Sequence, residues 1–181
     1  EHFCLTLSRR VGLNTALSEV RRFDGAVAIV IERFDRAIHG TTVLRLHAED
    51  FCQALGVAPE RKYENEGGPG PTAIVNLLRG RSTNPVEDIA TFVEALMFNW
   101  LIAGTDAHAK NYSILIGPQG HVRLAPLYDI ASVLAYDRID VRDARLAMRV
   151  GRYYKLDVIH PRHWREAARA LKLPEEIVMQ R

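Results

Sequence analysis

The sequence of 181 residues has few cysteines, few lysines and no long apolar run. Cys4 and Cys52 are too few for a disulfide framework or a zinc site, so we expect two buried thiols in a reducing cytosol. No apolar stretch approaches the roughly 18 residues that a transmembrane helix needs. The first residues show neither the basic start nor the apolar core of a secretory signal. We therefore expect a cytoplasmic protein without a membrane partner.

The charge is nearly balanced. The chain has 24 basic and 22 acidic residues and a net charge of +2, which does not by itself imply nucleic-acid binding. Only four of the basic residues are lysines: Lys62, Lys110, Lys155 and Lys172. The hydrophobic fraction of 48% excludes a disordered chain and predicts a real core.

The apolar patterning predicts several helices and two hairpins. Helices are expected over residues 1–12, 49–55, 71–78, 84–103 and 160–171, with a further one from Pro174. Asp24-Gly25 is a strong hairpin signal between the strand-like residues 15–23 and 26–31, and the second of these runs is expected to be buried. Residues 112–116 and 121–125 predict a second hairpin. The expected fold class is α+β, mostly helical.

A polar segment, Gly104–Asn111, follows directly after the most apolar predicted helix. Asp106 and Asn111 in it are separated by four residues, and a predicted hairpin and then Asp129 follow. Phosphoryl transfer uses one carboxylate to orient the attacking hydroxyl, and an Asn and a second carboxylate to hold Mg²⁺. Protein kinases carry these groups in the same order. The pattern therefore indicates a phosphotransferase site.

Each of these residues also has a simpler explanation. Asp106 could be an ordinary loop carboxylate, Asn111 could satisfy a turn, and Asp129 could cap the residues after it. His108 has no second His or Cys at metal-ligand spacing. Lys110 is either a solvated charge or a phosphate contact.

Several motifs resemble the HipA family, the kinase-fold toxins of bacterial type II toxin–antitoxin modules. Residues 99–113 and the segment Arg123–Asp129 carry the closest resemblance. Ile31–Arg36, Lys62–Gly70 and Leu156–Trp164 are similar to further signatures of the family. The resemblance covers nearly the whole chain.

The resemblance implies a protein-kinase-like C-lobe with a residual β-hairpin of the N-lobe. Residues 1–36 would be the end of the N-lobe (helix, hairpin and hinge), and residues 37–181 the helical C-lobe. Asp106 would be the catalytic base, and Asn111 and Asp129 the Mg²⁺ ligands. The residues that would bind the nucleotide are Glu32, Arg33, Phe34, His108 and Tyr128.

The resemblance also implies a reaction and partners. The cofactors would be ATP and Mg²⁺, and the γ-phosphate would pass to a Ser or Thr hydroxyl of a translation factor or an aminoacyl-tRNA synthetase, causing growth arrest. The antitoxin would be a HipB-like helix-turn-helix protein, with DNA contacted indirectly through that complex.

One part of the family pattern is absent from these 181 residues. HipA kinases use a Gly-rich loop over the phosphates and a strand lysine that pairs with them. The first lysine here is Lys62, and the only glycine before Gly25 is Gly12. We therefore expect the 181 residues alone to be inactive, as the hinge and most of the C-lobe of a larger kinase. Glu1 is a candidate for the helix carboxylate that would pair with the absent lysine.

Two alternatives remain open at this stage. A small-molecule phosphotransferase usually has a His-Gly-Asp loop and an Asp-Phe/Trp-Asp segment, where this chain has Gly104-Thr-Asp106 and Tyr128-Asp129. A degenerate kinase could instead act as an antitoxin- or DNA-binding module through an arginine patch, although arginines on solvated faces explain the same pattern. The arginines of that candidate patch are Arg138, Arg142, Arg145, Arg149 and Arg152.

Overall fold

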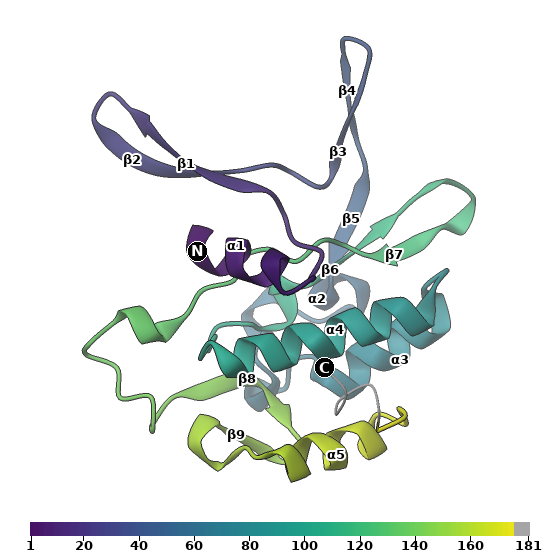
Figure 1. Ribbon diagram of the computed structural model, residues 1–181. Helices are drawn as coiled ribbons and strands as arrows, with labels where there is room; N and C mark the ends of the chain where they lie inside the picture. The colour runs from purple at the N-terminus through teal and green to yellow at the C-terminus, as the bar shows by residue number, and fades with distance from the viewer. Residues whose placement is uncertain (176–181) are drawn as a thin grey trace.

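The computed structural model describes residues 1–175. The hairpins of residues 18–31 and 36–45 stand above a helical body, and the hairpin of residues 145–155 and the helix of residues 161–170 lie below it (Figure 1). The helices are α1 (His2–Arg10), α2 (Phe51–Ala54), α3 (Pro71–Arg81), α4 (Pro85–Leu101) and α5 (Pro161–Ala170). The strands are β1 (Ser18–Phe23), β2 (Ala26–Ile31), β3 (Arg36–His39), β4 (Thr42–Arg45), β5 (His47–Asp50), β6 (Ser113–Ile116), β7 (Val122–Leu124), β8 (Arg145–Val150) and β9 (Tyr153–Lys155).

The strands form four small antiparallel sheets. β1–β2, β3–β4 and β8–β9 are two-stranded, and β5, β6 and β7 form a three-stranded sheet in that order. In that sheet Glu49 of β5 lies opposite Ile114 of β6, which in turn lies opposite Leu124 of β7. The loop after α4 leads into β6, so this sheet fixes the residues that follow the polar segment Gly104–Asn111.

The core is built around α4. Phe92 is fully buried, and its ring lies 6.3 Å from that of Phe51 in α2 and 5.1 Å from that of Tyr112 before β6. Burying an aromatic side chain of this size stabilises the fold by roughly 1.5–3 kcal/mol. Cys4 and Leu5 of α1 belong to the same hydrophobic cluster, so α1 is packed onto the helical body (Figure 1).

Most predicted elements are confirmed. Both hairpins and the helices over 71–78, 84–103 and 160–171 are present, with shifted ends. Cys4 and Cys52 are buried free thiols, as expected. The helix expected from Pro174 lies mostly outside the described residues. The domain boundary expected after residue 36 stays a prediction.

Other expectations are corrected. α-Helices and short 3₁₀ helices together hold 39% of the described residues, and strands hold 24%, so a mostly helical chain is not confirmed. The reason is that β3, β4, β5 and β9 have only three or four residues each, and none of these strands, nor β8, shows the regular apolar alternation that predicts strands. Val27 of β2 is 60% exposed, because β2 pairs only with β1 within residues 1–175. Phe3 of α1, Val11 directly after α1 and Leu101 of α4 are exposed, not part of a buried stripe.

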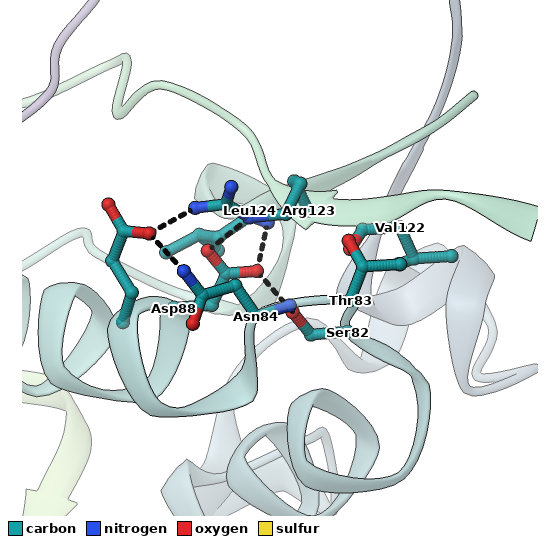
Figure 2. Close-up of polar contacts among 8 residues, drawn as sticks. Ser82, Thr83, Asn84, Asp88, Val122, Arg123 and Leu124 are labelled. Carbon is teal, nitrogen blue, oxygen red and sulfur yellow. Dashed lines mark hydrogen bonds and ion pairs between the residues drawn. The ribbon is translucent and has the colours of Figure 1, made fainter.

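Buried Asp88 joins the first turn of α4 to β7 (Figure 2). Its carboxylate accepts hydrogen bonds from the Ser82 hydroxyl at 2.6 Å, the Leu124 amide at 2.9 Å and Arg123 Nε at 3.0 Å. A buried carboxylate needs such partners, because its desolvation is otherwise unfavourable. Asn84 precedes α4 but does not cap it with its side chain, which donates instead to Glu87.

Across residues 1–175, no helix combines the length and apolar character needed to cross a lipid bilayer.

Candidate active site

The polar loop begins at a fixed point after α4. Ala103 has a positive φ of 52°, and a Cβ at the next residue, Gly104, would lie 2.3 Å from Asn99 Oδ1. Asn99 is itself held, since its amide donates to the Ala95 carbonyl at 2.9 Å and to the Tyr112 hydroxyl at 3.2 Å. Only glycine fits at position 104, because any side chain there would collide with Asn99. The backbone therefore passes close to Asn99 where it leaves α4.

Asp106 lies at the surface of this loop, with 66% of its side chain exposed. The Tyr63 hydroxyl donates a hydrogen bond of 2.5 Å to Asp106 Oδ1. His108 Nε2 lies 3.9 Å from the same oxygen. The other carboxylate oxygen is open to an incoming hydroxyl group, which is what a general base requires.

His108 is buried beside Asp106, and the Tyr63 ring packs edge-on against it at 5.1 Å. Burial and the nearby positive charge of Lys62 lower the pKa of His108, although Asp106 acts in the opposite direction. The imidazole is therefore predominantly neutral near pH 7. Its Nδ1 atom is buried and has no hydrogen-bond partner within residues 1–175.

Asn111 and Asp129 lie side by side. Asn111 Nδ2 donates to Asp129 Oδ2 at 2.6 Å, while the buried Asn111 Oδ1 has no partner among the described residues. Asp129 has a positive φ of 54°, a strained conformation that often marks functional sites. The Leu127 backbone just before it bonds to Asn14 and Ala16, which fixes this turn against the segment after α1.

This pair fits a magnesium ion. Mg²⁺ prefers oxygen ligands, and Asn111 and Asp129 offer an amide oxygen and a carboxylate. The unpartnered, buried Oδ1 of Asn111 is an acceptor that the protein leaves unsatisfied. Within residues 1–175 there is no group of three or more His, Cys, Asp or Glu that could hold a metal, so ligands beyond this pair would come from phosphate oxygens and water.

A cleft of about 530 Å³ adjoins the pair. It is lined by the end of β2 and the hinge residues after it, by parts of β4 and β5, and by the turn that holds Asp129. The sequence-predicted residues that line it are Glu1, Glu32, Arg33, Phe34, Tyr128 and Asp129. Asp106, His108 and Asn111 do not line it, and Asp129 connects the cleft to Asn111, the last residue of the polar loop. Burial and the charge of Asp129 raise the pKa of Glu1.

Tyr128 joins the cleft to the polar loop. Its hydroxyl donates to the Lys110 carbonyl at 2.7 Å and lies 2.6 Å from the Ser113 hydroxyl. Its ring stacks on Phe34, with centroids 5.3 Å apart. Burial raises the pKa of Tyr128 to about 12, so the phenol stays protonated.

Lys110 is neither fully solvated nor free. Its Nζ atom lies 2.6 Å from Oδ2 of Asp50, a residue that lines the cleft and also caps α2. A lysine paired in this way holds the loop against β5 and α2. It is not available as a free phosphate contact.

Sequence reasoning missed several residues near the site as individuals. Tyr63 and Glu64 belong to the recognised segment Lys62–Gly70, but their contacts with Asp106 and Arg149 span 43 and 85 residues of sequence. Asp50 had no signal beyond its role in starting a short helix. Asp35 follows the hinge directly and is buried between Arg33 and Arg36.

Asp35 predicts a pH dependence of stability. The hydrogen bonds from Arg33 lower the pKa of Asp35 from 3.8 to about 2. Its stabilising contribution is therefore complete above pH 4 and is lost as the pH falls towards 2. We expect the free energy of unfolding to fall by about 1–2 kcal/mol over this window because of Asp35, since solvent screens the exposed Arg33. Urea unfolding at each pH should show a weaker dependence in Asp35→Asn, and equal slopes would contradict the assignment.

Comparisons with known proteins identify the family of the chain. The family model of the HipA-like C-terminal domain matches residues 1–181. The chain is 40% identical over 170 residues to the protein Y4mE of Sinorhizobium fredii, covering 93% of this chain and 40% of that protein. It is 34% identical over 149 residues to the serine/threonine-protein kinase toxin HipA of Shewanella oneidensis, covering 76% of this chain and 34% of the toxin. The chain thus spans well under half the length of these relatives.

Solved structures give the same result for the fold. The Shewanella oneidensis HipA, in a complex with HipB and operator DNA, superposes with a TM-score of 0.90 at 28% identity, covering 99% of this chain and 44% of that one. The Helicobacter pylori proinflammatory kinase CtkA superposes with a TM-score of 0.53 at 14% identity. The superposition covers 71% of this chain and 43% of the CtkA chain, and it shows likeness of fold alone. By the family match and the structural likeness together, the chain belongs to the family of HipA-like C-terminal domains.

Proposed function

We propose that these residues form the catalytic part of a HipA-like Ser/Thr protein kinase toxin. One observation carries the proposal. Asn111, at the end of the loop that holds Asp106, bonds to Asp129, and Asp129 lines the cleft together with the hinge residues. A phosphotransferase needs a nucleotide cleft, a metal pair and a base in this order.

In this proposal each residue has one task. Asp106 orients the acceptor hydroxyl and takes up its proton as the oxygen attacks the γ-phosphate. Asn111 and Asp129 would hold Mg²⁺, which when bound neutralises charge on the phosphate oxygens. Phe34 and Glu32 would bind the adenine through their backbone, since no hydrogen bond within residues 1–175 engages the Phe34 amide or the Glu32 carbonyl. Tyr128, which lines the cleft, would lie beside the nucleotide, whereas His108 is buried outside the cleft lining.

Two of the cations near the cleft already have an acidic partner, whereas Arg45, which lines it, has no ion pair among the described residues. Lys110 pairs with Asp50, and Arg33 pairs with Asp35. Lys62 lies over the Tyr63 ring. No Gly-rich loop and no lysine precede the hinge in the 181 residues. We therefore propose that the phosphate-binding lysine and loop come from outside these residues, with Glu1 as the carboxylate that pairs with that lysine.

The partners follow from the same proposal. The HipA toxin of Shewanella oneidensis was solved with HipB and operator DNA. A HipB-like helix-turn-helix antitoxin is therefore the proposed partner here, with DNA contacted through it. The proposed substrate is a translation factor or an aminoacyl-tRNA synthetase, and growth arrest is the proposed result.

The arginine patch gives little support to a DNA-binding module. Arg142 pairs with Asp140, and Arg149 pairs with Glu64. Arg145 and Arg152 lie over the rings of Tyr154 and Tyr153. Of the five candidate arginines only Arg138 has neither an ion pair nor a ring contact among the described residues, so the patch offers few free phosphate contacts. Weak dependence of any DNA affinity on salt concentration would confirm that phosphate contacts are few.

An acceptor panel tests the proposal against a small-molecule phosphotransferase. The natural protein that contains these residues is incubated with Mg²⁺ and γ-labelled ATP, first with candidate protein acceptors and then with aminoglycosides and choline. We expect label on Ser or Thr of a protein. Label only on a small molecule would replace the protein-kinase proposal with the alternative.

The metal pair predicts a second result. Asn111→Ala and Asp129→Ala should each weaken Mg²⁺–ATP binding by roughly tenfold. Each removes one oxygen ligand of the Mg²⁺ ion, and the loss of one contact to a charged group is worth about that factor. Asp106→Asn is the matched control, since the side chain of Asp106 bonds to Tyr63 and not to the Asn111–Asp129 pair. Calorimetric titration measures all three. Equal nucleotide affinity in the three variants would contradict the metal assignment.

A further inference from the structure

Tyr63 is the residue beside Asp106 that the proposed function leaves without a role. Its hydroxyl donates to Asp106 Oδ1 at 2.5 Å, and its ring packs edge-on against His108. Within the described part of the chain, no other residue donates a hydrogen bond to the Asp106 carboxylate. An exposed aspartate with no partner would sample several rotamers.

The backbone of Tyr63 is locked in place. The Tyr63 carbonyl accepts from the amides of Glu66 at 3.1 Å and Gly68 at 2.9 Å. The neighbouring Lys62 carbonyl accepts from the Ala109 amide at 3.2 Å, which joins this segment directly to the polar loop. A Cβ at Gly68 would lie 2.1 Å from the Arg61 carbonyl oxygen, so this tight turn requires glycine.

Glu64 anchors the same segment to β8. Its side chain is 10% exposed, accepts the Arg149 amide at 2.8 Å and lies 3.0 Å from Arg149 Nε. A Cβ at Gly70 would lie 2.0 Å from Glu64 Oε1, so the backbone passes directly over this carboxylate. The segment that carries Tyr63 is therefore built as a rigid support and not as a free surface loop.

We propose that Tyr63 is a positioning residue that holds the Asp106 carboxylate through Oδ1 and leaves Oδ2 for the acceptor hydroxyl. This inference rests on the proposed kinase function. The hydrogen bond to Asp106 raises the pKa of Tyr63 to about 12, so the phenol remains a donor throughout the working pH range. A preorganised base is effective because its geometry needs no rearrangement when the acceptor binds.

The test is Tyr63→Phe in the natural protein that contains these residues. Phenylalanine keeps the ring contact with His108 and removes only the donor. We expect kcat for phosphate transfer to fall about tenfold, as for loss of one hydrogen bond to a charged group. The dissociation constant for Mg²⁺–ATP should not change, because Tyr63 does not line the cleft. Tyr136→Phe is the control, since Tyr136 is an exposed tyrosine.

A double mutant separates positioning from a structural role. If Tyr63 acts through Asp106, Tyr63→Phe should cause no further loss of residual transfer in an Asp106→Asn background, whereas a structural effect would add to it. Unchanged kcat in an active Tyr63→Phe protein would overturn the inference and leave the proposed function standing. Phosphate found on Tyr63 itself would also overturn it, because the phenol would then be an acceptor. An inactive wild-type protein would contradict the proposed function instead.

Discussion

Asp106→Asn is expected to reduce phosphate transfer by roughly 10²–10⁴-fold, the range that a general base contributes. Asparagine keeps the shape of the side chain and can still accept from the Tyr63 hydroxyl, but it cannot take a proton from the acceptor. Because Asp106 is 66% exposed and outside the core, the fold should be unaffected. Single-turnover transfer from γ-labelled ATP measures the chemical step.

Asp137→Asn is the matched control, because Asp137 is an exposed aspartate away from the cleft. Its rate should equal that of the wild type. If Asp106→Asn transferred phosphate at the wild-type rate, Asp106 would be an ordinary loop carboxylate and the base assignment would be wrong.

Asp88→Ala is expected to destabilise the fold by about 3 kcal/mol, the lower end of the range for breaking a buried ion pair. The substitution leaves the Leu124 amide and Arg123 Nε without their acceptor (Figure 2). Arg123 is 43% exposed and can turn to water, which limits the loss. Denaturant unfolding gives the free energy directly.

Glu87→Ala provides the comparison, since Glu87 bonds to the same Arg123 but is 60% exposed. An exposed ion pair contributes less than about 1 kcal/mol. Similar losses in the two variants would show that Asp88 does not join α4 to β7 in the way described.

The elements that could be predicted have strong local signals. α4 begins at Pro85, and its apolar stripe repeats at three and four residues from Ile89 on, so packing and helix period agree. Asp24-Gly25 has positive φ at both residues, the conformation that a two-residue hairpin turn requires. Such signals depend on neighbouring residues only, which is why they can be found in one sequence.

Burial was harder to predict than the elements themselves. The apolar run Ala26–Ile31 has the composition of a buried strand, yet the β1–β2 arm stands away from the helical body (Figure 1). Burial depends on what packs against a strand, and composition does not specify that. Phe3 and Val11 show the same limit on α1, where the buried face is Cys4, Leu5 and Ser8.

The candidate site divides in the same way. Asp106, Asn111 and Asp129 could be proposed from spacing and order, and the structure places Asn111 and Asp129 in contact. The contacts of Tyr63 with Asp106 and of Lys110 with Asp50 join residues 43 and 60 positions apart, and no local pattern predicts them. Such long-range polar contacts become visible only when the chain is folded.

The most direct measurement of the central claim is transfer of the γ-phosphate of labelled ATP by the natural protein that contains these residues, with and without Mg²⁺. The account predicts label on Ser or Thr hydroxyls that requires Mg²⁺ and disappears in Asp129→Ala. No transfer in the presence of Mg²⁺, or equal transfer by Asp129→Ala, would contradict the proposal that this site is the catalytic centre of a protein kinase.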